Sequence, residues 1–246
     1  MTKARLDTLL VKRGFVADKK EAQLLIAEGS VLVAGLPNTK AFAQVDAGVD
    51  IKLKATSQSW VSRGAYKLLA GLKAFNLDPA GMIALDVGAS TGGFTDVLLQ
   101  QGARKVYAVD VGYGQLAWKL QQDERVIVLD RENIRTLDPD KLLDPIDITV
   151  VDASFISLTL LLGKVATLMQ GSAGKPIVAL IKPQFEARKD QVGQGGVVRD
   201  PEVHQQCIDD VSTWAKTRGF GVGGVVESPV RGPAGNIEFL IELRTP

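Results

Sequence analysis

The sequence predicts an α/β protein in which a doubly wound, mostly parallel sheet follows a small α+β domain. Three observations indicate this fold: apolar runs of strand length alternate with stretches of helical spacing, a glycine-rich turn follows the first such run, and charged residues end several of the others. The 246 residues fit one large and one small domain, and a hydrophobic content of 46% is enough to form a core in each.

Residues 1–54 are predicted to form the small domain. A helix over Arg5–Arg13 ends at Gly14, where a left-handed residue is favoured. A second helix begins at Asp18, whose side chain can cap it, and ends at Gly29. The strands and the turn expected after these helices are 31–33, 35–38 and 49–53.

The basic residues are concentrated in the front part of the chain. Residues 1–73 contain twelve Lys or Arg against six Asp or Glu, whereas residues 74–246 contain 17 against 22. The net charge of +1 conceals this division. A basic front half indicates a surface for a polyanion such as RNA, and a merely solvated face is the alternative interpretation.

The large domain is predicted over residues 62–246, after a short polar linker at 55–61. Its first helix runs from about Ser62 to Phe75 and carries Lys67 in its first turns. Five apolar runs then indicate the parallel strands: Met82–Val87, Val106–Val109, Val126–Asp130, Ile148–Asp152 and Ile177–Lys182. Helices are expected between them near 95–101, 115–122 and 158–169.

Charged residues end four of these runs. Parallel strands of such a sheet end at one edge, where ligands bind, so these side chains are expected to form a site. They are Asp110, Asp130, Asp152 and Lys182. A polar, Gly-rich loop over Gln184–Arg199 is a candidate lid, a helix capped by Asp200 follows, and strands at 222–227 and 237–241 complete the sheet.

The glycine turn within Leu85–Thr95 is the candidate cofactor site. A dinucleotide fingerprint needs glycine at three places, and Ser90 stands at the middle one, where it would meet the pyrophosphate. S-adenosylmethionine has no phosphate, and its polar groups suit a turn flanked by Asp86, with Asp110 able to accept hydrogen bonds from the ribose. A nicotinamide or flavin site and a turn without a ligand are the alternatives.

The residues opposite a methyl donor determine the reaction. Methylation of cytosine carbon-5 needs a thiolate nucleophile, but Cys207, the single cysteine, lies within a predicted amphipathic helix. Amino-group methylation commonly uses Asn or Asp followed by two prolines and an aromatic residue, and the fourth strand here ends in Asp152-Ala153-Ser154-Phe155. Neither pattern is present.

Methylation of a ribose hydroxyl, which is a weak acid, requires a base or a strong electrostatic field beside the attacking oxygen. A lysine can supply it where burial and a neighbouring cation favour the neutral amine. Lys182 ends a very apolar strand, and Asp152 at the adjacent strand end can orient it. Lys67 and Glu238 complete a quartet of balanced charge.

Two resemblances follow from these residues. Residues 3–54, with two short helices followed by strands, resemble the small RNA-binding domain first described in ribosomal protein S-four. The order Ser62–Leu68, Asp152, Lys182–Pro183 and Glu238 resembles the Lys-Asp-Lys-Glu tetrad of the FtsJ-type ribose methyltransferases. With the runs Asp86–Thr95, Val111–Leu116 and Lys182–Glu186, the chain from about residue 3 to 243 is similar to the TlyA family, often labelled haemolysins.

This resemblance implies an S-adenosylmethionine-dependent rRNA methyltransferase with a Rossmann-like catalytic domain, acting on a ribose 2′-hydroxyl of cytidine. The implied catalytic residues are Lys67, Asp152, Lys182 and Glu238, with Lys182 as the base. The implied cofactor contacts are Asp86, Gly88, Ser90, Gly92, Gly93, Asp110, Asp130 and Asn133. The implied RNA contacts are Arg5, Lys12, Arg13, Lys19, Lys20, Lys40, Arg63, Arg188 and Lys189, and no metal site is implied.

Relatives in that family carry Arg-Ala-Trp-Val in the linker, whereas this chain has Gln58-Ser59-Trp60-Val61, a departure that bears on substrate choice. The alternative functions are a membrane-acting haemolysin and a non-catalytic ribosome-binding assembly factor. No apolar run of about eighteen residues exists, and the N-terminus lacks the apolar core of a secretory signal. With a single cysteine, the chain is expected to be cytoplasmic. The family resemblance implies that its partner is rRNA in ribosomal subunits.

Overall fold

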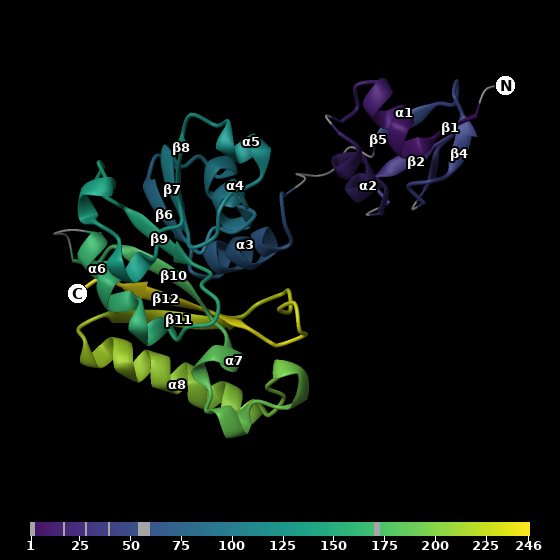
Figure 1. The fold of residues 1–246 in the computed structure, drawn as a ribbon. Coiled ribbons are helices and arrows are strands. Elements are labelled where there is room, and N and C mark those ends of the chain that lie inside the picture. The colour runs from purple at the N-terminus through teal and green to yellow at the C-terminus, as the bar shows by residue number, and fades with distance from the viewer. Residues whose placement is uncertain (1–2, 17, 28, 39, 54–59, 170–172) are drawn as a thin grey trace. The chain divides into compact units, whose positions relative to one another are not determined.

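The computed structural model describes residues 3–16, 18–27, 29–38, 40–53, 60–169 and 173–246 (Figure 1). The chain divides into two compact units, Met1–Ser59 and Trp60–Pro246. Most of the predicted linker, including Gln58 and Ser59, lies outside the described residues. Within the described residues, no helix is both long enough and apolar enough to cross a membrane.

The first unit packs two helices against two small antiparallel sheets. Leu6, Leu10 and Ile26 are fully buried between these layers. The helices are α1 (Leu6–Lys12) and α2 (Lys19–Ala27). One sheet has three strands in the order β3 (Leu36–Pro37), β2 (Val31–Val33), β5 (Ile51–Leu53), and the other pairs β1 (Lys3–Arg5) with β4 (Gln44–Asp46). The helices were therefore predicted correctly, but Arg5 ends a strand, and β1 and β4 were not predicted.

The helix ends follow the predicted chemistry. The Oδ1 atom of Asp18 accepts a hydrogen bond of 2.9 Å from the backbone N–H of Glu21, near the start of α2. Gly14 and Gly29, which follow the two helices, have φ angles of 74° and 68°, a region that favours glycine.

The second unit contains a seven-stranded sheet in the order β11-β12-β10-β9-β6-β7-β8. Only β12 runs antiparallel to its neighbours, which confirms the predicted fold class of a parallel sheet with one antiparallel strand near an edge. The strands are β6 (Ile83–Val87), β7 (Lys105–Asp110), β8 (Val126–Asp130), β9 (Ile148–Val151), β10 (Pro176–Ile181), β11 (Gly221–Glu227) and β12 (Phe239–Arg244).

Helices cover both faces of this sheet (Figure 1). Alternate residues of each central strand enter different cores: Ile177 packs on one face and Val178 on the other. The first face is covered by α6 (Leu162–Leu168) and α8 (Pro201–Thr217). The second is covered by α3 (Gly64–Ala74), α4 (Gly93–Gln100) and α5 (Trp118–Gln121).

Two segments differ from the sequence predictions. The helix predicted over residues 115–122 is reduced to the single turn of α5. Leu116 and Leu120 lie close to Gly92, where an added Cβ would approach them to 2.8 and 2.2 Å. The loop predicted over 184–199 includes α7 (Pro183–Glu186) and two short 3-10 turns, Lys189–Gln191 and Gln194–Gly196.

Candidate active site

The glycine turn joins β6 to α4 and brings backbone atoms very close to the next strand end. Gly88 has a φ of 83°, and a Cβ there would lie 2.7 Å from the carbonyl oxygen of Asp152. Ser90 adopts a φ of 48°, a conformation that costs a non-glycine residue energy and recurs at ligand sites. Its backbone N–H donates to Oδ2 of Asp110 at 2.8 Å, which ties the turn to the end of β7.

Asp86 lies beneath this turn and is completely buried. Its Oδ2 accepts a hydrogen bond of 2.6 Å from the hydroxyl of Thr95, whereas its Oδ1 has no hydrogen-bond partner among the described residues. Burial raises the pKa of this carboxyl to about 7, and the nearby charge of Asp152 adds to the rise. A buried acceptor atom without a partner is a position at which a ligand donor is favoured.

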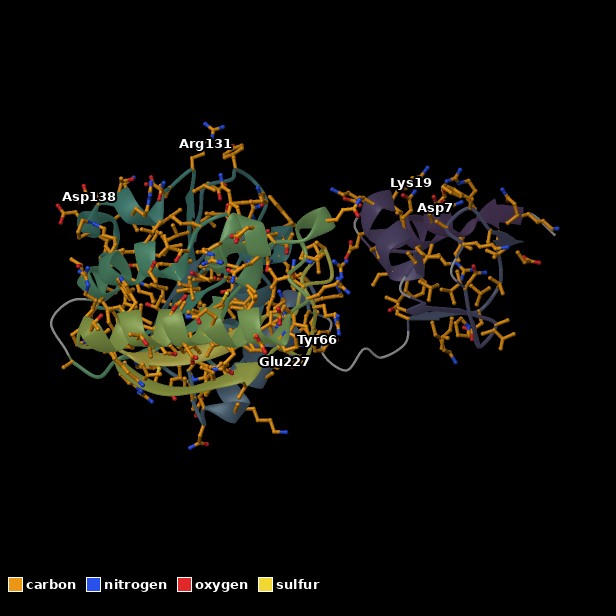
Figure 2. The ribbon with its side chains drawn as sticks, turned by 90° about the horizontal axis from the view of Figure 1, so that it is seen from below. Asp7, Lys19, Tyr66, Arg131, Asp138 and Glu227 are labelled. Atoms are coloured by element: carbon orange, nitrogen blue, oxygen red, sulfur yellow. The ribbon has the colours of Figure 1, made fainter. Side chains whose placement is uncertain are left out.

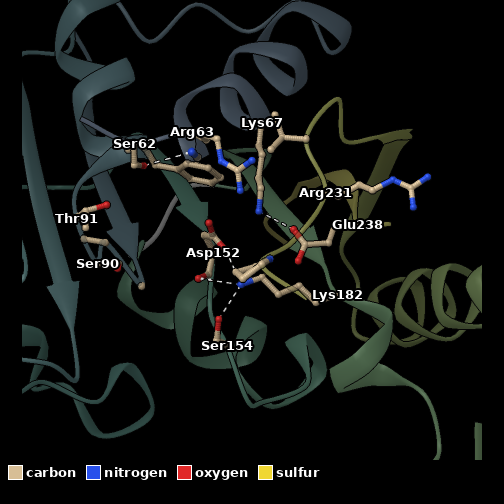
Figure 3. Close-up of a pocket in the computed structure, with 17 residues that line it drawn as sticks. Ser62, Arg63, Lys67, Ser90, Thr91, Asp152, Ser154, Lys182, Arg231 and Glu238 are labelled. Carbon is tan, nitrogen blue, oxygen red and sulfur yellow. Dashed lines mark hydrogen bonds and ion pairs between the residues drawn. The ribbon is translucent and has the colours of Figure 1, made fainter. Parts of the chain in front are cut away.

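A pocket of about 330 Å³ opens beside the turn (Figure 3). Its wall is formed by the start of α3, the glycine turn, the residues after β9 and β10, and the loop before β12. Two ion pairs cross it. Nζ of Lys67 lies 2.6 Å from Oε2 of Glu238, and Nζ of Lys182 lies 2.5 Å from Oδ1 of Asp152.

The sheet register explains why three of these side chains meet. Ile181 pairs with Phe239 in the antiparallel β10–β12 ladder, so the next residues along, Lys182 and Glu238, stand beside each other past the paired ends. Val151 pairs with Ala179 in the parallel β9–β10 ladder, so Asp152 follows the end of the strand on the other side of β10, and the side chain of Lys182 reaches it there. The fourth, Lys67, comes from α3, where the neighbouring Leu68 is fully buried against the sheet.

Both lysines are desolvated, but their partners differ in exposure. The side chains of Lys67 and Glu238 are 9% and 1% exposed, and those of Lys182 and Asp152 are 8% and 22% exposed. Lys182 also makes a hydrogen bond of 2.8 Å to the hydroxyl of Ser154. The Lys182–Asp152 pair therefore faces the open side of the pocket, where a hydroxyl group could approach the amine.

The structure brings the four predicted catalytic residues together, but it separates the predicted cofactor residues. Gly88, Ser90 and Gly93 line the pocket, and Asp86 lies under it. The others stand outside its lining. Gly92 faces Leu120, Asp110 accepts from the N–H groups of Ser90 and Gly112, Asp130 accepts from the N–H of Gly114, and Asn133 caps the 3-10 turn Ile134–Thr136.

The predicted RNA contacts fall into two groups. Arg5 and Arg13 have guanidinium groups that are already engaged: Arg5 forms two hydrogen bonds with the buried Asp7, and Arg13 donates to the carbonyls of Val49 and Ala47. The buried Asp7, which is the partner of Arg5, and the exposed Lys19 can be compared in Figure 2. Exposed positions in the first unit are Lys12, Lys19, Lys20 and Lys40. In the second unit Lys189 is exposed, Arg188 is exposed and pairs with Asp190 at 3.2 Å, and Arg63 lines the pocket.

Several pocket residues were not predicted from the sequence. Ser62, Thr91, Ser154 and Arg231 line the pocket alongside the predicted residues. Ser154 could have been found, because it follows Asp152 by two residues at a strand end that already carried a predicted catalytic group. Arg231 belongs to a loop whose sequence gives no signal of its place beside the pocket.

Comparisons with known proteins agree with this geometry. The model of the FtsJ-like methyltransferases matches residues 60–245. The 16S/23S rRNA (cytidine-2′-O)-methyltransferase TlyA of Mycobacterium tuberculosis is 46% identical over 99% of this chain and 90% of its own length. Hemolysin A of Brachyspira hyodysenteriae is 36% identical over 96% of this chain and 98% of its own.

Solved structures give the same result. A hemolysin-like protein from Streptococcus thermophilus is 42% identical to this chain and superposes with a TM-score of 0.75. The match covers 100% of this chain and 89% of that structure's chain. The family model matches most of the chain, and the relatives are this similar over nearly its whole length. A shared fold alone does not produce sequence identity of this extent. The chain therefore belongs to the FtsJ-like methyltransferase family.

Proposed function

We propose that this protein transfers a methyl group from S-adenosylmethionine to a ribose 2′-hydroxyl of cytidine in rRNA. The observation that carries the proposal is the pair of lysine–carboxylate contacts, Lys67–Glu238 and Lys182–Asp152, in one pocket beside the glycine turn. The names of the similar rRNA (cytidine-2′-O)-methyltransferases, which the chain matches along almost its full length, support the same substrate.

The residues around the turn fit the cofactor. Gly88 and Gly93 let the turn pack closely against Asp152 and Ser62 of the pocket wall, Asp86 offers an acceptor without a partner among the described residues, and Asp110 ends the neighbouring strand. We infer that these residues, with Ser90, Gly92, Asp130 and Asn133 around them, hold the nucleoside and amino-acid parts of S-adenosylmethionine. Carboxylates at the strand ends also suit the positive charge of its sulfonium group.

When bound, S-adenosylmethionine supplies an electrophilic methyl group. The residues of this chain prepare the oxygen that attacks it. In its neutral form, Nζ of Lys182 would accept the proton of the 2′-hydroxyl as that oxygen takes the methyl group, and Asp152, 2.5 Å away, would stabilise the ammonium group that results. Lys67 places a positive charge near the developing negative charge, and Glu238 holds it there.

We infer that the first unit, over about residues 1–54, binds RNA, that residues 62–246 form the catalytic domain, and that the intervening linker is short. Exposed lysines on the first unit, including Lys12, Lys19 and Lys20, suit phosphate contacts, which position an RNA without reading its sequence. A protein with this substrate acts in the cytoplasm on ribosomal subunits.

Methyl transfer with labelled S-adenosylmethionine to subunits that lack the modification tests this function. The wild-type protein should label rRNA, and mapping of ribose methylation should locate the nucleotide. Lys182→Ala should bind the cofactor but transfer at least about a hundredfold more slowly, the range for loss of a general base. Lys216→Ala, which removes an exposed lysine from α8, is the matched control. Binding of subunits and cofactor without transfer by the wild type would instead indicate an assembly factor.

A further inference from the structure

Arg231 lies in the hairpin loop between β11 and β12, at the edge of the pocket. Val230 and Pro233 of the same loop also line the pocket. Figure 3 shows that the guanidinium group of Arg231 extends away from the paired amines of Lys67 and Lys182. Arg231 is exposed, so its charge is available at the mouth of the pocket rather than among the groups inside.

Two arginines in the pocket lining add positive charge beyond the two lysine–carboxylate pairs. Each lysine is paired with one carboxylate, so the four groups inside carry no net positive charge. Arg63 and Arg231 also line the pocket, and within the described part of the chain neither forms an ion pair with a carboxylate. Arg231 makes one hydrogen bond there, from Nη1 to the carbonyl of Gly235 at 3.4 Å.

The hairpin loop is held in place by its own backbone. Gly232 N–H donates to the carbonyl of Asn236 at 2.9 Å, and a Cβ on Gly232 would lie 2.4 Å from Oε1 of Glu238. Asn236 is 1% exposed and fastens the loop to the segment before α8: its Nδ2 donates to Gly196 and its Oδ1 accepts from Val198, both at 2.9 Å. Arg231 is therefore attached to a backbone that also positions Glu238.

The structure assigns Arg231 to a backbone phosphate of the RNA, next to the ribose that enters the pocket. This assignment rests on the proposed function, in which a ribose hydroxyl reaches Lys182. Each ribose of an RNA chain is flanked by phosphates, and the four paired groups inside the pocket carry no net positive charge to hold them, so a cation is favoured at the mouth. The planar guanidinium fork matches two phosphate oxygens, and Arg63 on the α3 side of the pocket adds a second positive charge.

Equilibrium binding of 16S and 23S rRNA transcripts, made in vitro and therefore unmethylated, tests the assignment. Arg231→Gln should raise Kd by about tenfold, the effect of losing a hydrogen bond to a charged group. The slope of log K against log salt concentration should become shallower by about 0.7 to 0.9, as expected for one lost phosphate contact. Arg231→Lys keeps the charge and should keep the wild-type slope. Arg218→Gln is the control, because Arg218 stacks over the ring of Trp214 near the end of α8.

Two results would overturn the assignment. Arg231→Gln and Arg218→Gln could have the same Kd and slope, or Arg231→Lys could lose the slope as fully as Arg231→Gln, in which case the side chain only shapes the hairpin. Methyl transfer by the wild type is measured on the same transcripts and on subunits. Its absence would refute the proposed function alone, since the binding slopes are measured without catalysis.

Discussion

Replacing Asp86 by Asn should make the second unit more stable at high pH. The pKa of Asp86 in the folded protein is about 7, because the carboxyl is buried, whereas its ordinary value is 3.8. The folded state therefore keeps a proton that the unfolded state loses, and this contribution to stability is complete below about pH 4 and is lost as the pH rises through 7. The difference of about three pH units corresponds to about 4 kcal/mol.

An asparagine in this place stays neutral at every pH and offers an oxygen to the hydroxyl of Thr95, as the carboxyl does now. The free energy of unfolding of Asp86→Asn minus that of the wild type should therefore increase by about 4 kcal/mol between pH 4 and pH 8. Both proteins are measured without cofactor, so that only the buried carboxyl distinguishes them.

Urea unfolding followed by tryptophan fluorescence measures this difference. Trp60, Trp118 and Trp214 are the three tryptophans of the chain, and all belong to the unit Trp60–Pro246, so the signal follows that unit alone. Asp209→Asn, which removes an exposed carboxylate from α8, gives the baseline for losing a charge at the surface. A stability difference that stays constant from pH 4 to 8, or that decreases, refutes the assignment of a buried, protonated Asp86.

Two substitutions and one labelling experiment test the site and the packing around it. Lys67→Met leaves Glu238 buried without its lysine partner, so the free energy of unfolding in urea should fall by about 3 to 5 kcal/mol. Lys105→Met, whose partner Asp144 is partly exposed, should lower it by under about 1 kcal/mol, and equal losses would contradict this reasoning. Gly88→Ala should weaken S-adenosylmethionine binding in calorimetry far more than Gly81→Ala, which shares a positive φ but has open space around it, and similar losses would remove the role of close approach. Burial raises the pKa of the Cys207 thiol to about 11, so native protein should resist a thiol reagent at pH 8 that modifies urea-unfolded protein fully; rapid native labelling would show an accessible thiol.

The sheet and its charged edge could be predicted because they depend on local patterns. Apolar runs located β6 to β10, and the rule that parallel strands end at one edge placed Asp152 beside Lys182. Glu238 required the family resemblance, because its position depends on the antiparallel register of β10 and β12 across about sixty residues of chain, which no local pattern encodes.

Features that depend on single contacts could not be predicted. The resemblance to the ribosomal RNA-binding domain implied that Arg5 contacts RNA, and it gave no sign that Asp7, two residues along, engages the guanidinium of Arg5. The strands β1 and β4 have three residues each, too few for a periodic pattern, and their pairing joins residues about forty apart. The packing of Leu116 and Leu120 beside Gly92 also becomes visible only in three dimensions.

The glycines around the pocket also limit how this enzyme could acquire a new substrate during evolution. Added Cβ atoms at Gly93 and Gly232 would lie 2.3 Å from the hydroxyl of Ser62 and 2.4 Å from Glu238, so mutations there displace the pocket wall or the proposed catalytic carboxylate before they alter selectivity. Val230, Arg231 and Pro233 line the same pocket on a loop fixed from behind by Asn236. Adaptation to another RNA is expected to begin at these three positions, and a mutant library for redesign belongs there.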